Sequence, residues 1–245
     1  MFGDPATFLL RVLFLVPALL LGFVLHEFAH AAVALSQGDP TPKNQGRLSL
    51  DPRRHLDPVG VLMVLFVGIG YARPVQINPS RLRTEFSRLL VALAGPAANL
   101  AIAIVASVAL KLIAGSQAVL GFPDFGAACS VSISPLEIVK TAFFYIYTMN
   151  LFLMLFNLLP IPPLDGFELI RTVLRRNNPR LVFQIEMNSQ QIFFGFILIF
   201  LLLPSFVPAF DFLSVLPHHD RHPPAPDHLA GSPTAAALRL TMPRL

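Results

Sequence analysis

Long apolar stretches separated by polar loops give the chain its pattern. Four of them can cross a bilayer as helices, and they cover about residues 7–36, 86–114, 136–159 and 192–216. A fifth stretch, 59–71, has only 13 residues and would reach about 20 Å as a helix, which is too short for a ~30 Å hydrocarbon core. The pattern predicts an all-α polytopic membrane protein with about four transmembrane helices.

Charge indicates how the short stretch 59–71 enters the membrane. Basic residues lie on both sides of it, namely Lys43, Arg47, Arg53 and Arg54 in the loop before it, Arg73, Arg81 and Arg83 in the loop after it, and Arg88 at the start of the next stretch. If the stretch crossed, one of these loops would lie outside, against the positive-inside rule. We therefore expect a re-entrant loop that lines a cavity or is covered by protein. Residues 115–136 contain no Lys or Arg, which predicts an outer loop.

Composition narrows the class of protein. With 54% hydrophobic and 13% charged residues, the chain is too apolar for an ordinary soluble domain. The formal charge of +4 comes from Lys and Arg in loops, so it indicates membrane topology and no nucleic-acid partner. A single cysteine, Cys129, excludes an intramolecular disulfide and a thiolate-based metal site.

The chain divides into two parts. Residues 1–216 predict one membrane-embedded domain, and residues 217–245 form a tail rich in Pro, Ala and His that we expect to be disordered. The tail histidines could bind a metal loosely, although a solvated polar tail is the favoured interpretation. They are His218, His219, His222 and His228.

A His-Glu-x-x-His motif lies inside the first apolar stretch, at residues 26–30. On a helix, residues four apart share one face, so His26 and His30 can bind one Zn²⁺ together, and Glu27 can reach a water bound to it. Ionisable residues inside a membrane helix are costly and are functional by default. The motif therefore predicts a site for one zinc ion per chain.

A catalytic zinc takes three protein ligands, so the sequence must supply a third. Counting crossings from an outer N-terminus places the histidines and Asp165, which follows the stretch 136–159, on the same cytoplasmic side. Asp165 is therefore the natural candidate. Asn99, a polar residue in the apolar middle of the stretch 86–114, favours a helix–helix hydrogen bond over a catalytic role.

The polar, turn-rich segment 37–58 offers rival ligands. His55 and Asp57 could bind the metal, although such a pair more often caps a loop. Residues 47–50 alternate like a strand, which predicts a short β-hairpin near the active site.

These residues resemble the site-2 protease family of intramembrane zinc metalloproteases, in particular its compact bacterial branch without a PDZ domain. The resemblance covers about residues 15–175 and rests on the motifs at 26–30 and 157–166, supported by those at 95–99 and 55–60. It implies that His26, His30 and Asp165 bind zinc and that Glu27 is the general base. Phe167 departs from the family pattern, in which many members have a second glycine after Asp-Gly, and we expect it to change packing beyond the site.

The resemblance also implies that Asn157 lies at the active site. Its amide could hydrogen-bond the substrate backbone or the oxyanion that develops during attack. A helix–helix hydrogen bond is the structural alternative.

The residues and the resemblance together predict a zinc endopeptidase that hydrolyses peptide bonds within or near the transmembrane segment of membrane-protein substrates. Two other classes remain open, a non-catalytic metal-binding membrane protein and a zinc or proton transporter. The complete set of ligands and base argues against the first. The grouping of polar residues at one membrane level argues against the second.

Location and partners follow from this function. We expect a multi-pass protein of the bacterial inner membrane, with the active site towards the cytoplasm. The expected partners are a membrane-spanning protein substrate and the lipid bilayer, and a homo-oligomer is compatible with the sequence.

Overall fold

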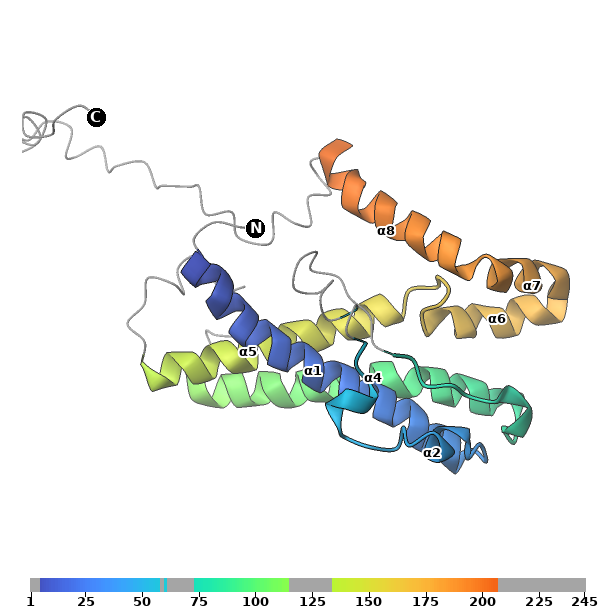
Figure 1. Cartoon of the computed structure of the whole chain (residues 1–245), viewed down its shortest axis with the longest axis horizontal. Coiled ribbons are helices and arrows are strands. Elements are labelled where there is room, and N and C mark those ends of the chain that lie inside the picture. Colours follow the sequence, from blue (N-terminus) through green and yellow to red (C-terminus); the bar gives the residue numbers. More distant parts are fainter. Residues whose placement is uncertain (1–4, 58–59, 61–72, 115–133, 207–245) are drawn as a thin grey trace, which may run out of the picture.

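The computed structural model describes residues 5–57, 60, 73–114 and 134–206, and it consists of helices joined by loops (Figure 1). Their bounds are α1 Pro5–Ser36, α2 Thr41–Asn44, η1 Pro52–Arg54, η2 Pro79–Arg81, α4 Glu85–Ala114, α5 Pro135–Asn157, α6 Gly166–Asn177, α7 Pro179–Met187 and α8 Ser189–Phe206. This confirms the all-helical class. The predicted re-entrant loop, apart from Gly60, and the tail 217–245 lie outside the described residues.

Three helices form the body of the molecule, because α1, α4 and α5 pack against one another (Figure 1). Each is long and apolar enough to cross a membrane, over Val12–Ser36, Glu85–Ile113 and Pro135–Asn157. The predicted stretches 7–36, 86–114 and 136–159 agree with these spans to within a few residues. At the fourth predicted stretch the structure shows a shorter apolar helix, Ser189–Ile199, within α8.

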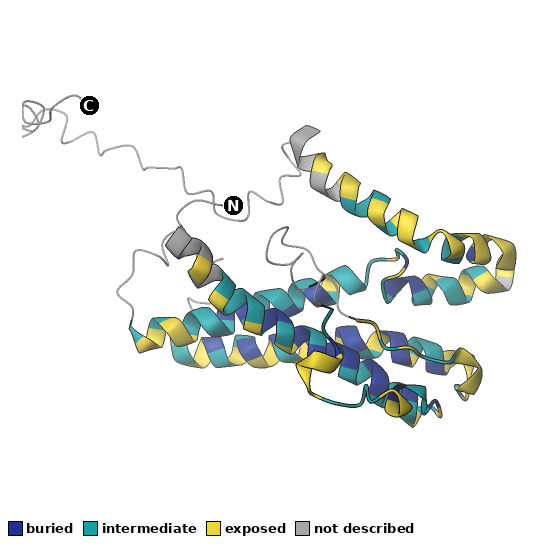
Figure 2. Cartoon of the chain, viewed as in Figure 1, coloured by how far each residue is buried: buried dark blue, intermediate teal, exposed yellow. Residues whose placement is uncertain are grey.

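The core of the bundle combines small residues with large aromatic ones. Ala18, Leu110, Phe144 and Tyr145 form one buried cluster, in which the three helices meet. Gly22 brings α1 close to α5, since a Cβ at this position would lie 2.7 Å from Leu153 Cδ1. In Figure 2 the buried residues accordingly gather along α1, α4 and α5, whereas α8 is largely exposed. An exposed apolar helix is the surface expected of a protein surrounded by lipid.

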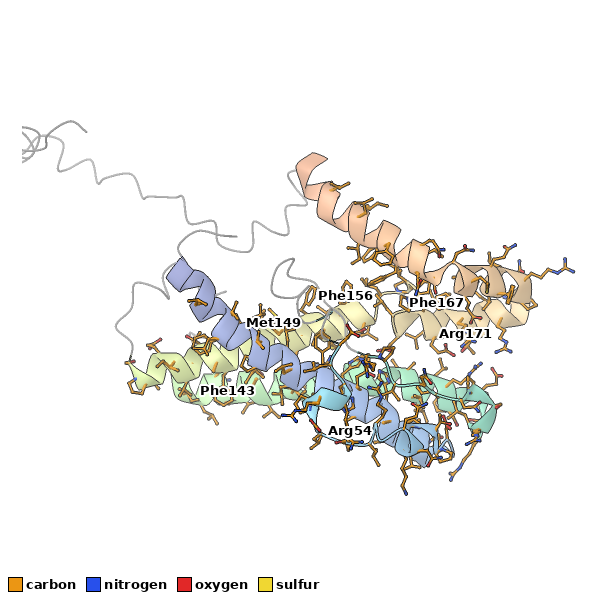
Figure 3. The ribbon with its side chains drawn as sticks, viewed as in Figure 1. Arg54, Phe143, Met149, Phe156, Phe167 and Arg171 are labelled. Atoms are coloured by element: carbon orange, nitrogen blue, oxygen red, sulfur yellow. The ribbon has the colours of Figure 1, made fainter. Side chains whose placement is uncertain are left out.

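Helices α6 and α7 were not predicted. They are short and amphipathic, and they extend from the end of α5 towards α8 (Figure 1). Arg171, labelled on α6 in Figure 3, pairs with Glu168 on the same helix at 2.8 Å and with Glu186 on α7 at 2.5 Å. Arg88 on α4 lies 3.8 Å from Glu168. These ion pairs tie α6 and α7 to the bundle.

The predicted β-hairpin at residues 47–50 was wrong, because no strand occurs in the part of the chain that the structure describes. Two backbone groups of this segment bond to nearby residues, one in α2 and one in the loop, and not to a neighbouring strand. Arg47 N–H donates to Pro42 O at 2.9 Å, and Ser49 O lies 2.7 Å from His55 Nε2. An alternating pattern over four residues is too short to outweigh such contacts.

Candidate metal centre

The two histidines of the His-Glu-x-x-His motif lie on one face of α1 and are almost fully buried. Their Nε2 atoms are 3.0 Å apart. Asp165, in the turn between α5 and α6, points at the same place, with Oδ2 lying 3.1 Å from His26 Nε2 and 3.3 Å from His30 Nε2. The structure therefore brings together the three predicted ligands, although His30 and Asp165 are 135 residues apart in the sequence.

The donor set fits a zinc ion. A tetrahedral zinc with bonds of about 2.0–2.1 Å holds its ligand atoms about 3.3 Å from one another. The three separations observed here, 3.0, 3.1 and 3.3 Å, are close to that value. Two imidazoles and one carboxylate also form a typical ligand set of a catalytic zinc. His26, His30 and Asp165 are the residues that would hold the metal.

Asp165 has the charge that a metal ligand needs. Without a metal and with both imidazoles protonated, burial acts to raise the pKa of its carboxyl group, but hydrogen bonds from His26 and His30 and the positive charge of these rings outweigh burial and lower the pKa to about 2. The carboxylate is therefore ionised at neutral pH, which is the form that binds metals. The rings give up their Nε2 protons when they bind a metal.

Helix α4 contacts both histidines of the centre. His30 Nδ1 lies 2.7 Å from the carbonyl oxygen of Val91, which can only accept, so this nitrogen donates and, in the neutral ring that binds a metal, Nε2 carries the lone pair. Gly95, one turn further, faces both imidazoles. A Cβ at this position would overlap His30 Nε2 and lie 2.5 Å from His26 Nε2. Only glycine leaves room here for the histidines.

Asn99 completes the contact of α4 with the histidines. Its side-chain amide lies 3.1 Å from His26 Nδ1, and the residue is fully buried. The bond joins α4 to α1, as the helix–helix interpretation of Asn99 expects. That its partner is a zinc-ligand candidate could not be seen in the sequence.

Glu27 lies beside the metal ligands and borders a cavity of about 330 Å³. His30 and Asp165 also line the cavity, together with three further charged residues, namely Arg88, Glu168 and Arg171. Glu27 Oε2 accepts a hydrogen bond from Val75 N–H at 2.9 Å. Phe167, labelled in Figure 3, is buried and lines the same cavity. A carboxylate, two candidate ligands and a polar wall thus share one space.

The rival ligands lie elsewhere. His55 is fully buried in its loop with Nε2 2.7 Å from Ser49 O, and Asp57 Oδ1 accepts from Gly60 N–H at 3.2 Å. Among the described residues, the group that can hold a metal contains neither of them. These contacts agree with the loop-capping interpretation.

Asn157 occupies the last turn of α5. Its amide donates to Leu153 O, one turn earlier, at 2.9 Å. It is not among the described residues that line the cavity around Glu27. A catalytic role of Asn157 stays a prediction.

Comparison with known proteins agrees with a metal centre of a peptidase. The model of peptidase family M50 matches residues 14–202. The chain is 40% identical over 159 residues to "Putative zinc metalloprotease YwhC" of Bacillus subtilis, which is 64% of this chain and 67% of that protein. It is also 29% identical to "Putative zinc metalloprotease Rip2" of Mycobacterium tuberculosis over 191 residues. This aligned region covers 76% of this chain and 65% of that protein. No solved structure matches the chain.

The matches cover about two thirds of the length of these two relatives. The family match spans most of the chain and contains the His-Glu-x-x-His motif and Asp165. The sequence resembles this family, and that resemblance implied that His26, His30 and Asp165 lie together beside Glu27, as the structure shows. The chain therefore belongs to peptidase family M50, the site-2 protease family of zinc metalloproteases.

Proposed function

We propose that this protein is an intramembrane zinc endopeptidase that cuts membrane-spanning protein substrates within or near their transmembrane segment. The observation that carries the proposal is the convergence of three metal-ligand atoms within 3.0–3.3 Å of one another, next to a glutamate on a cavity. Both relatives named above are described as zinc metalloproteases, which supports the same reaction class.

The residues of the site have separate tasks in this reaction. His26, His30 and Asp165 hold the zinc, which when bound supplies a Lewis acid that activates water near neutral pH. Glu27 takes a proton from the attacking water while the water oxygen bonds to the peptide carbonyl carbon. It then delivers that proton to the leaving nitrogen as the C–N bond breaks. Val75 N–H holds Glu27 Oε2 and so orients the base.

The cavity gives water a route to this chemistry. A peptide bond in hydrocarbon has no water of its own, so an intramembrane protease needs a polar space beside the site. Arg88, Glu168 and Arg171 line the cavity with charged groups, and the same space contacts Glu27. This arrangement supports hydrolysis at membrane depth.

The placement in the membrane belongs to the proposal as well. We expect α8 to serve as the fourth span, with the segment 59–71 re-entrant and the active site towards the cytoplasm of a bacterial inner membrane. The apolar surface of α8 supports its crossing, since Phe194, Leu198 and Ile199 are all exposed. A homo-oligomer is compatible with the described surface.

Cleavage by the purified chain tests the function. With zinc and a model transmembrane substrate in proteoliposomes, Glu27→Gln should retain zinc but lose at least about 10²-fold in turnover, because glutamine cannot accept the proton. Asp165→Ala should lose the metal. Glu137→Gln is the matched control, since Glu137 pairs with Lys140 near the other end of α5.

The outcomes separate the competing classes of protein. Cleavage by Glu27→Gln at the wild-type rate would show that the general-base assignment is wrong. A wild-type chain that binds zinc and cuts nothing would be a non-catalytic metal-binding protein. Zinc or proton uptake into the liposomes without cleavage would identify a transporter.

A further inference from the structure

We propose that Asn99 is a positioning residue for the zinc ligand His26, which it holds in the one tautomer that can bind the metal. The proposal rests on the proposed function, because it concerns the same metal centre. Asn99 does not touch the zinc or the substrate. It acts on the ring nitrogen of His26 that faces away from the metal.

Three successive turns of α4 each place one residue against the two histidines. Val91, Gly95 and Asn99 are four residues apart and therefore share one face of α4. Val91 O bonds to His30 Nδ1 at 2.7 Å, Gly95 leaves space for both rings, and the Asn99 amide bonds to His26 Nδ1 at 3.1 Å. Each histidine thus has a partner on α4 for the nitrogen that does not face Asp165.

The chemistry of imidazole decides what these partners must do. A neutral histidine carries one N–H, and it binds a metal only through the other nitrogen. The Nε2 atoms of both rings face each other and Asp165, so Nε2 is the ligand atom and Nδ1 carries the hydrogen. The partner of each Nδ1 must therefore accept a hydrogen bond.

Val91 meets this demand because a carbonyl oxygen is only an acceptor. Asn99 meets it in one of its two amide orientations. Nδ2 lies towards His26, whereas Oδ1 is buried and has no hydrogen-bond partner among the described residues. A half-turn of the amide exchanges two atoms of nearly equal shape and brings Oδ1 to His26 Nδ1. We assign this orientation, since Oδ1 can then accept the hydrogen on His26 Nδ1, which leaves His26 Nε2 free for zinc.

A partner of this kind changes metal affinity without contacting the metal. Hydrogen bonds to the second nitrogen of a ligand histidine fix the ring and its tautomer, and their loss typically lowers metal affinity 10- to 100-fold. A buried asparagine that only joined two helices would affect stability instead. Zinc affinity therefore distinguishes the two roles.

The test compares two variants of Asn99 with one of Asn150. Asn99→Leu keeps the approximate size but removes the acceptor, whereas Asn99→Asp keeps an acceptor oxygen. Asn150→Leu is the matched control, because Asn150 is also fully buried, but its amide donates to Ile146 O in its own helix. Zinc affinity is measured on the full-length chain in detergent by competition with a chelator, and thermal unfolding is measured on the metal-free forms.

We expect Asn99→Leu to bind zinc about 10- to 100-fold more weakly than wild type, and Asn99→Asp to lie within a few-fold of wild type. Asn150→Leu should keep its zinc affinity even if it unfolds at a lower temperature. If Asn99→Leu does not fold, Asn99→Ala serves the same comparison.

Wild-type affinity in the Asn99→Leu or Asn99→Ala chain would overturn the proposal, as would an Asn99→Asp chain that binds as weakly as Asn99→Leu. Failure of the proposed function gives a different result. A wild-type chain that binds zinc but cuts nothing refutes the protease and leaves the role of Asn99 standing, whereas a wild-type chain that binds no zinc refutes both.

Discussion

Gly95 shows how much of the centre depends on a single residue. The His26 and His30 rings occupy the space where any other residue would place its Cβ. The histidines also cannot withdraw easily, because Val91 and Asn99 bond to their Nδ1 atoms from the same helix. A larger residue must therefore push α4 away from α1 and disturb the ligand geometry.

We predict that Gly95→Ala lowers both stability and zinc affinity. Overpacking of a buried contact destabilises by about 1–3 kcal/mol, and displaced rings should bind zinc at least about 10-fold more weakly. Gly195→Ala in α8 is the control, because its Cβ would meet nothing within 4 Å. Thermal unfolding and zinc competition check both effects. Unchanged zinc binding in Gly95→Ala would contradict the close approach of α4.

At the scale of elements, Asp39 joins the loop after α1 to the segment that precedes η2. Its Oδ1 accepts from Thr41 N–H at 3.0 Å, and its Oδ2 accepts from Asn78 N–H at 2.7 Å. Val75, three residues before Asn78, holds Glu27. Asp39 thus helps to fix the segment that contacts Glu27, the proposed general base.

The same contacts predict a pH dependence of stability. Burial acts to raise the pKa of Asp39, but hydrogen bonds from Thr41 and Asn78 and the charge of Arg81 outweigh burial and lower the pKa below its ordinary value. A carboxyl group with a lowered pKa in the folded state stabilises the fold above its unfolded value of about 3.9, and this contribution disappears as the pH falls from there through the folded pKa.

We therefore expect wild-type protein to lose more stability than Asp39→Asn between about pH 5 and pH 3. Asp51→Asn is the control, since Asp51 is exposed and asparagine can also cap η1 through its side-chain oxygen. Thermal unfolding across this range, in metal-free protein, measures the difference. Parallel curves for wild type and Asp39→Asn would exclude a contribution from Asp39.

At the scale of the whole molecule, the three-helix bundle and the arm formed by α6, α7 and α8 meet at the metal centre. Asp165 lies at the start of that arm, and the bundle supplies both histidines. The arm is held by the contacts of α4 with α6 and by the pairing of Arg88 with Glu168. The ligand set is therefore complete only when both parts are in place.

We predict the topology that this arrangement requires. A reporter fused at Ser80 should lie in the cytoplasm, one at Gly121 outside, and one after Leu245 outside if α8 crosses. Enzymatic reporters that are active on only one side of the membrane give the measurement. An external Ser80 would mean that the stretch 59–71 crosses, and a cytoplasmic C-terminus would mean that α8 does not.

The sequence by itself determined the properties that depend on neighbouring residues. The length and hydropathy of a stretch decide whether it can span a bilayer, so three spans could be predicted to within about five residues. The four-residue spacing of His26 and His30 fixes their common face on a helix. Asp165 could be proposed because charge in the loops places helix ends on one side of the membrane.

Only the tertiary structure decided what lies around those residues. Helices α6 and α7 carry charged residues that become informative only through their ion pairs with each other and with α4. Val75 on Glu27 and Asn99 on His26 are contacts between segments 48 and 73 residues apart. The pattern of neighbouring residues cannot predict contacts between segments so far apart in the sequence, because the tertiary packing of the chain brings them together. The sequence thus specified the candidate ligands, and the fold specified the partners that contact them.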